Sequence, residues 1–418
     1  MSARAPARRD SILDERTFVR FWLGRLCAVF AYQMLSVAVG WQIYALTGSA
    51  LDLGLVGLAQ FMPSVALMLV VGHVADRFDR RKITRACQWI EAAAIAAIAL
   101  ATLHGAVTEA MIFALVAVIG AARAFETPTV QALLPFTVST RNLPHAVALS
   151  STAGQTGIVL GPALGGLLYV AGPTVVYAVC VALFIAASVL LGWLTPVRAA
   201  AAHVTTNSRS IFAGIKFIRS KEALLGAISL DLFAVLLGGA TALLPIFARD
   251  ILQTGPWGLG LLRSAPAVGA LATALWLARR PIQRHAGRRM FAGVAAFGIA
   301  TILFGLSSWF PLSLAALVML GVSDMMSVVV RQSLVQLNTP DHMRGRVAAV
   351  NSMFIGASNQ LGEFESGLTA SWWGAVPAVV VGGLGTLVIA GLWMRLFPKL
   401  AAVDRLEVHE DSIDERPA

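Results

Sequence analysis

Residues 72–82 read GHVADRFDRRK, a short and strongly charged stretch between two long apolar runs. The run 53–75 ends within this stretch, and the run 86–104 follows it. Each run is about 20 residues long, which is the length that an α-helix needs to cross the hydrocarbon core of a bilayer. The sequence around residue 77 therefore predicts a basic loop between two transmembrane helices.

The same alternation continues through all 418 residues, of which 57% are hydrophobic and only 13% are charged. Soluble domains carry about 25% charged residues, so this chain cannot form a water-facing shell. We predict an all-α integral membrane protein with twelve transmembrane helices. The predicted spans are 21–46, 53–75, 86–104, 110–136, 146–170, 173–194, 224–247, 257–278, 290–308, 312–336, 347–371 and 374–396.

Lys and Arg residues lie mostly on one side of these spans, which sets the orientation. The segments on the side of the N-terminus hold 27 of the 32. Cytoplasmic loops are enriched in Lys and Arg, so both termini are predicted to be cytoplasmic, as an even number of spans requires. The net charge of +10 then reflects orientation, and we expect no nucleic-acid partner. The predicted location is the inner membrane of a bacterium.

The chain divides into two six-helix halves, 21–194 and 224–396, with a cytoplasmic tail 1–20 before them. The linker 195–223 contains a short amphipathic stretch around Ile215 and Ile218, typical of an interfacial helix lying against anionic lipid. The tail 397–418 is charged, and we expect it to be disordered.

The two halves resemble each other at a nearly constant displacement, which indicates a duplicated unit. The matching pairs, displaced by 201 to 203 positions, are Gly57 and Gly260, Pro63 and Pro266, Gly120 and Gly321, Gly161 and Gly362, and Gly166 and Gly367. Duplicated six-helix units are a transporter architecture, with the substrate site between the halves near the bilayer midplane.

The stretch 72–82 resembles the signature loop of the major facilitator superfamily, G-x-x-x-D-R-x-G-R-R. Gly72, Asp76, Arg77, Arg80 and Arg81 match it, and an aspartate replaces the second glycine. A basic loop with a stray carboxylate is the alternative, but the spacing favours the family. The resemblance implies a gating loop that packs the cytoplasmic ends of helices 2 and 11 in the outward-facing state. Negative charge at Asp76 also suits a helix N-terminus.

Helix 5 carries a second motif that resembles G-x-x-x-G-P-x-x-G-G, the antiporter motif of exporters in this superfamily. Its residues here are Gly157, Gly161, Pro162, Gly165 and Gly166. Small residues four apart also let helices approach closely, so packing without directional meaning is the alternative. The proline and the glycine pair favour an exporter.

Helix 4 resembles the l-x-x-x-R-x-x-Q-G motif of drug:proton antiporters at Arg123, with Glu126 in place of Gln and Thr127 in place of Gly. An arginine inside the membrane needs a partner, and Glu126, one turn away, can provide it. Taken together, the motifs look most like the enterobactin-exporter branch of this group.

Ionisable residues inside the spans are concentrated on helices 1, 4, 7, 10 and 11, and the first four of these line the central cavity in the superfamily that the chain resembles. We predict the cavity residues to be Arg25, Tyr32, Gln33, Arg123, Glu126, Asp231, Asp324 and Arg331. Glu363 and Glu365 point to nearly opposite faces of helix 11, and the pattern does not choose between them. We expect at least one of Asp231, Asp324, Glu363 and Glu365 to carry protons. Glu91 and Arg263 lie near span ends, where they can snorkel to the interface.

These observations favour a proton-coupled exporter of a small amphipathic molecule, such as a siderophore or a drug. Alternatives are an importer or a lipid or metabolite mover of the same superfamily, a membrane enzyme, and a sensor. The sequence offers no nucleophile, paired acids or metal cluster for an enzyme, and the three cysteines lack a metal-ligand spacing. We expect no cofactor or metal, a monomer, and the bilayer, the substrate and protons as partners.

Overall fold

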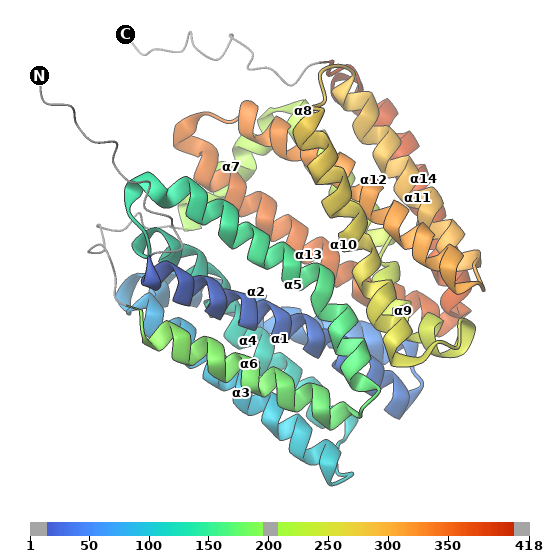
Figure 1. The fold of residues 1–418 in the computed structure, drawn as a ribbon. Coiled ribbons are helices and arrows are strands. Elements are labelled where there is room, and N and C mark those ends of the chain that lie inside the picture. Colours follow the sequence, from blue (N-terminus) through green and yellow to red (C-terminus); the bar gives the residue numbers. More distant parts are fainter. Residues whose placement is uncertain (1–14, 195–207, 405–418) are drawn as a thin grey trace, which may run out of the picture.

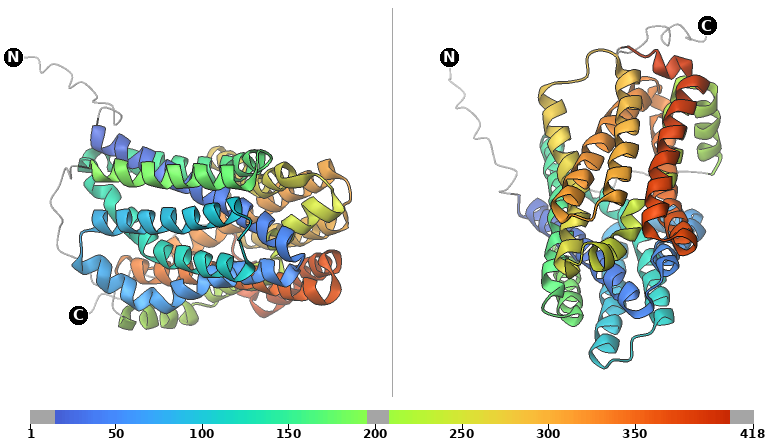
Figure 2. Two further views of the ribbon diagram at one scale, coloured as in Figure 1. Left: turned by 90° about the horizontal axis from the view of Figure 1, so that it is seen from below. Right: turned by 90° about the vertical axis from the view of Figure 1, so that its right-hand side faces the viewer.

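A computed structural model describes residues 15–194 and 208–404, and this part of the chain is helical without strands. The helices of the N-terminal half are α1 (Arg16–Thr47), α2 (Ala50–Arg77), α3 (Arg80–Leu103), α4 (Glu109–Leu133), α5 (Leu143–Tyr169) and α6 (Pro173–Gly192). The longer helices of the C-terminal half are α8 (Glu222–Leu237), α10 (Gly255–Arg279), α11 (Ala286–Leu306), α12 (Phe310–Leu337), α13 (Asp341–Trp373) and α14 (Ala375–Leu396). Figures 1 and 2 show these halves as two bundles lying side by side.

Within the described residues, ten helical segments are long and apolar enough to cross a membrane. Helices α5 and α13 fall outside this set, although they contain 27 and 33 residues. Both carry many polar residues and glycines, and both pack against the opposite half of the molecule. Their length suits a span, and the total of twelve spans stays a prediction.

The seventh predicted span, 224–247, is not one continuous helix. Helix α8 ends at Leu237, and the chain continues through η4 (Ala240–Leu243), α9 (Leu244–Ile246) and the π-helical turn η5 (Phe247–Ile251). The break falls at Gly238 and Gly239, because glycine is a poor helix former. Gly239 also packs directly against the backbone of Gly362 on α13. The irregular backbone is covered by protein, as it must be at membrane depth.

The predicted repeat is visible in the packing of glycines. Gly166 on α5 lies against Gly260 on α10, and Gly367 on α13 lies against Gly54 on α2. Within the halves, Gly120 on α4 meets α2 and its counterpart Gly321 on α12 meets α10. Equivalent glycines therefore allow equivalent close approaches, and the two halves join along α5–α10 and α2–α13.

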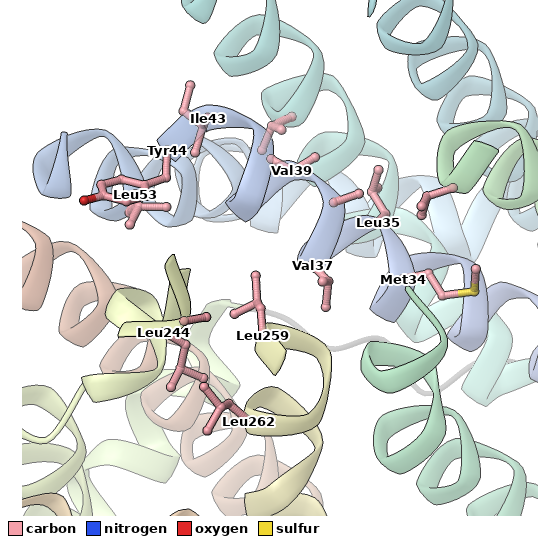
Figure 3. Packing of buried hydrophobic residues seen from close by; sticks show 14 of the residues in the cluster. Met34, Leu35, Val37, Val39, Ile43, Tyr44, Leu53, Leu244, Leu259 and Leu262 are labelled. Carbon is pink, nitrogen blue, oxygen red and sulfur yellow. The ribbon is translucent and has the colours of Figure 1, made fainter. Parts of the chain in front are cut away.

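The two halves touch at one end and diverge toward the other (Figure 1). At the touching end, Val37 of α1 faces Leu259 of α10 in a shared apolar core (Figure 3). At the other end, where α2 leads into α3, Gly72 of α2 and Gly345 of α13 are exposed. We call these the closed end and the open end.

The interfacial position of the linker helix stays a prediction, and the prediction of a disordered last tail needs correction. The amphipathic helix α7 (Ser208–Ser220) exists, and its residues Ile215 and Ile218 belong to one apolar cluster with residues of α8, α12 and α13. The start of the last tail is ordered, because α15 (Pro398–Ala401) buries Leu400 completely. The backbone N–H of Gly287, at the start of α11, donates to the carbonyl of Val403 at 2.9 Å. Residues 1–14, 195–207 and 405–418 lie outside the described part.

Candidate functional site

A cavity of about 480 Å³ lies between the two halves, and α1, α2, α5, α8, α10, α11, α12 and α13 all contribute to its wall. Its charged lining residues are Arg263 on α10, Asp324 on α12 and Glu363 on α13. The neutral polar ones include Tyr32, Gln33, Ser36, Gln60, Asn359 and Gln360, and the apolar ones include Ile158, Val235, Phe297 and Leu320. This mixture of polar and apolar groups suits an amphipathic ligand of drug size.

The arginine of the cavity joins the two halves. Nη1 of Arg263 donates a hydrogen bond to the backbone carbonyl of Ser36 on α1, at 2.9 Å. Glu363 lies close to Gly57 on α2, so close that a Cβ there would approach the glutamate side chain to 2.7 Å. These contacts place one cation and one carboxylate at the junction between the halves.

Behind the cavity, the C-terminal half contains a buried ion pair. Nη1 of Arg331 on α12 lies 2.6 Å from Oδ2 of Asp231 on α8, and both residues are at most 5% exposed. Asp231 and Asp324 line a small pocket together. Asp231 is therefore paired with Arg331, whereas Asp324 faces the main cavity.

The N-terminal half contains a second, smaller pocket of about 110 Å³, lined by Arg25, Arg123 and Glu126. The Arg123 guanidinium lies 3.5 Å from the ring centroid of Tyr32 on α1, and its Nη1 is 3.6 Å from Oε2 of Glu126. Nε2 of Gln88 on α3 donates to the other oxygen of Glu126 at 2.9 Å. A stacked guanidinium with a carboxylate partner is how an arginine is tolerated at membrane depth.

At the closed end, a polar latch fastens α1 to η5. The hydroxyl of Tyr44 donates a hydrogen bond to Oδ2 of Asp250. Nη1 of Arg249 donates to the backbone carbonyl of Tyr44 at 3.2 Å, and its guanidinium lies 5.6 Å from the Tyr44 ring. The two residues of η5 therefore hold the end of α1 from two directions.

The loop at the open end is stabilised by the residue that departs from the motif. Asp79 is the N-cap of α3, where Oδ1 accepts a hydrogen bond from the backbone N–H of Arg81 at 2.8 Å. Aspartate is among the preferred N-cap residues. The Arg80 guanidinium lies 5.6 Å from the ring of Phe136, and Arg77 is exposed. The side chain of Asp76 lies outside what the structure describes, so its predicted gating role stays a prediction.

The family described as transmembrane secretion effector matches residues 8–416, nearly the whole chain. This chain belongs to that family. Multidrug efflux pump Tap of Mycolicibacterium fortuitum is 25% identical over 384 residues, which cover 88% of this chain and 92% of Tap. Enterobactin exporter EntS of Shigella boydii is 27% identical over 375 residues, which cover 88% of this chain and 85% of EntS. The predicted membership of the major facilitator superfamily is confirmed, and members of this family are membrane transporters, not enzymes.

Solved structures show the same fold. A bacterial homologue of the lysosomal transporter Spinster, described as inward-facing and unoccupied, has a TM-score of 0.74 at 13% identity, with 92% of this chain and 98% of that chain covered. A bacterial homologue of the iron transporter ferroportin, described as inward-facing, has a TM-score of 0.70 at 18% identity, with 94% and 100% covered. The predicted all-α major facilitator fold is therefore confirmed for this secretion-effector chain.

The structure divides the predicted cavity residues of the transporter into three groups. Tyr32, Gln33, Asp324 and Glu363 line the main cavity. Arg25, Arg123 and Glu126 line the smaller pocket, and Asp231 and Arg331 form the pair behind the cavity. Glu365 is partly buried and is absent from the described pocket linings. Of the two acids on α13, Glu363 is therefore the one that faces the cavity, and the role of each residue in transport stays a prediction.

The glycines of helix 5 serve close packing in the secretion-effector fold. A Cβ at Gly161 would approach Cβ of Gln33 to 2.6 Å, and one at Gly165 would approach Cα of Met34 to 2.8 Å. Gly157 packs against Val29, and Gly166 reaches α10. The glycines of the motif thus let α5 pack closely against α1 and against α10 of the opposite half. That the motif marks an exporter remains a prediction.

Glu91 and Arg263 do not lie at the interface that their positions near the ends of the predicted spans suggest. Glu91 is completely buried in α3, and among the described residues neither of its carboxylate oxygens has a hydrogen-bond partner. Arg263 lies in the cavity wall instead of at an interface. Both errors came from uncertain span ends, because a shift of one helical turn moves a side chain from the interface into the bundle. The latch residues Tyr44 and Asp250 lie far apart in sequence and gave no signal.

Proposed function

We propose that this transmembrane secretion effector exports a small amphipathic molecule from the bacterial cytoplasm, across the inner membrane, in exchange for protons. The observation that carries the proposal is the cavity between the halves, in a molecule whose halves pack together at one end and diverge toward the other. Such a shape supports alternating access, in which the halves rock about a fixed central site.

The distribution of Lys and Arg supports an orientation in which the open end faces the cytoplasm. In this orientation the cavity receives its substrate from the inside, and the latch of Tyr44 and Asp250 seals the outer end. Export then requires the latch to open and the loop at 72–82 to close against α13. Tap is a multidrug efflux pump and EntS is an enterobactin exporter, and both support this direction.

Asp324 and Glu363 are the proposed proton carriers, because both face the cavity from the C-terminal half. A carboxylate that alternates between water and the bundle can bind a proton on one side and release it on the other. Arg123, Glu126 and Tyr32 are proposed to transmit movement between α1 and α4, through the stacked guanidinium.

The experiment compares small molecules inside and outside cells with and without this protein, under iron-starved and iron-replete growth. A siderophore retained by the deletion strain only under starvation would support siderophore export. A retained toxic compound under both conditions would support drug efflux instead. A compound that is retained by the wild type and lost from the deletion strain would support the importer alternative and contradict the proposal.

A further inference from the structure

A row of polar side chains lies between α3 and α4, inside the N-terminal half. Near the open end, Oγ1 of Thr84 lies 3.0 Å from Oγ1 of Thr129. One turn further along α3, Nε2 of Gln88 donates a hydrogen bond to Oε1 of Glu126 on α4 at 2.9 Å. The next turn of α3 carries Glu91. The row therefore leads from the open end to a carboxyl group in the interior of the half.

Glu91 has no hydrogen-bond partner at this position. Its side chain is completely buried, and among the described residues both of its carboxylate oxygens and Oε1 of Gln88 are unpaired. An ionised carboxylate without a partner is costly to bury, whereas a protonated carboxyl has an O–H to donate. Residues three apart on a helix are neighbours. A proton on Glu91 would therefore remove the buried charge and also supply a donor to the Gln88 oxygen.

The balance of charge around Glu91 also requires a proton. Arg123 and Glu126 are the charged residues of α4 that act electrostatically on Glu91. Nη1 of Arg123 lies 3.6 Å from Oε2 of Glu126, so this guanidinium already has one carboxylate partner. Two acids and one guanidinium carry an excess of one negative charge when both acids are ionised. A single proton on Glu91 makes the group neutral.

The other neighbours of Glu91 do not supply a counter-ion. Helix α3 also packs against α6, whose sequence contains no charged residue. The titratable groups of α6, Tyr177 and Cys180, donate hydrogen bonds to α1. On α3 itself, the thiol of Cys87 is only a weak donor, and the guanidinium of Arg85 lies against Gly192 at the end of α6. A proton is therefore the compensation that remains for Glu91.

The pocket of about 110 Å³ gives this proton a path to water. Arg25, Arg123 and Glu126 line it, together with Gln131, which is exposed. In the described part of the chain, Arg25 makes no hydrogen bond or ion pair. If Arg123 turned from Glu126 to Glu91, Arg25 would be the cation beside Glu126 that could replace it. Both acids would then have a guanidinium partner without a proton.

We propose that Glu91 is a proton-binding site of the N-terminal half. In the described conformation Glu91 holds the proton, and Arg123 is paired with Glu126. When Arg123 turns to Glu91, the O–H bond of Glu91 breaks, the proton passes to water in the pocket, and Arg25 pairs with Glu126. The same turn removes the guanidinium from the ring of Tyr32, which lines the main cavity. Its role in coupling rests on the proton exchange proposed above, whereas the presence of the proton does not.

The test uses infrared spectra of the purified full-length protein at neutral pH, because a protonated carboxyl and a carboxylate absorb at different frequencies. We expect Glu91→Gln to lose the signal of one protonated carboxyl. Glu126→Gln should lose the same signal, since Arg123 then pairs with Glu91, the remaining acid. Glu109→Gln, which replaces an exposed acid in the first turn of α4, is the matched control and should keep the signal.

A further measurement needs no variant. After transfer of the wild type into deuterium oxide, the signal of Glu91 should shift, because the pocket lets the proton exchange with water. A signal that does not shift overturns the proposed path.

The variants separate the remaining outcomes, with unfolding temperature and monodispersity showing that each is folded. An unchanged carboxyl signal in Glu91→Gln overturns the proposal. A signal that persists in Glu126→Gln would show that burial alone keeps Glu91 protonated, and it overturns the exchange of partners by Arg123. The spectra do not depend on transport. If they agree with the proposal but the protein ignores a pH gradient, the function proposed above fails while the proton-binding site stands.

Discussion

At the scale of single residues, charge inside the bundle is tolerated only through specific partners. Arg331 and Asp231 illustrate this, since each is almost fully buried and they lie 2.6 Å apart. Seven residues away on the same helix, Asp324 makes no ion pair among the described residues and lines the cavity. The two acids therefore have different environments, because Asp231 is paired inside the bundle and Asp324 faces the cavity.

Removing one member of the buried pair should destabilise the protein strongly. Arg331→Met leaves Asp231 buried and unpaired, which typically costs about 3–5 kcal/mol, and we expect a lower unfolding temperature in detergent. The double variant Asp231→Asn with Arg331→Met should recover most of the loss. The control is Lys399→Met, which breaks an ion pair to Glu222 that is largely exposed and worth about 0–1 kcal/mol. A single variant as stable as the wild type would contradict the structural role of the pair.

The stacked arginine should not tolerate replacement by lysine. Arg123→Lys keeps the charge but loses the planar group that lies on Tyr32 and reaches Glu126. We expect export to fall several-fold, consistent with about 1–2 kcal/mol for a desolvated cation–π contact, while the unfolding temperature changes little. Arg141→Lys, an exposed residue, provides the control. Export at the wild-type rate in Arg123→Lys would show that a positive charge at position 123 is enough for transport, without the planar guanidinium.

At the scale of helices, glycines set how closely the two halves approach. A Cβ at Gly260 would lie 2.6 Å from the carbonyl oxygen of Pro162 on α5, which is too close for any rotamer to relieve. Gly260→Val should therefore hold the closed end apart and abolish export, although the protein still reaches the membrane. Gly391→Val is the matched control, because a Cβ there would meet no atom of the described residues within 4 Å. Normal export by Gly260→Val would show that transport does not require close contact between α5 and α10.

The polar latch makes a related prediction at the end of α1. Tyr44→Phe removes the hydroxyl that donates to Asp250, and a hydrogen bond to a charged acceptor contributes about 1.5–3 kcal/mol. We expect the population that is open at this end to increase. Spin labels at the exposed residues Leu46 and Gln253, one in each half, should then report longer distances than in the wild type. An unchanged distance distribution would show that the hydrogen bond of Tyr44 does not hold the closed end together, and that apolar packing suffices.

The helices themselves could largely be predicted from the sequence, because spans follow from the length and apolarity of each run. The broken helix between Leu237 and Leu252 could not, since a Gly-Gly pair inside an apolar run is compatible with a continuous membrane helix. Its geometry depends on the contact of Gly239 with α13, and no local pattern encodes that contact.

At the scale of the whole molecule, the repeat and the family motifs predict two related halves. The structure shows that these halves join through the equivalent contacts α5–α10 and α2–α13. The assignment of cavity residues was less complete. Spacing identifies which residues share a helix face, but it does not reveal which neighbour that face meets. The spacing of Arg331 and Asp324 predicts that both face the cavity, but the ion pair with Asp231 holds Arg331 in the bundle. The position of Glu91 in its predicted span suggests an interface, but the residue is completely buried.

The most direct test of export in exchange for protons uses everted membrane vesicles, whose interior corresponds to the outside of the cell. The vesicles are given an acidic interior, the membrane potential is clamped with potassium and valinomycin, and labelled cationic, neutral and anionic amphiphiles are supplied outside. We expect at least one probe to accumulate in vesicles with this protein, and the accumulation to stop when the pH gradient is collapsed. Accumulation only in right-side-out vesicles, or uptake that ignores the pH gradient, would contradict it.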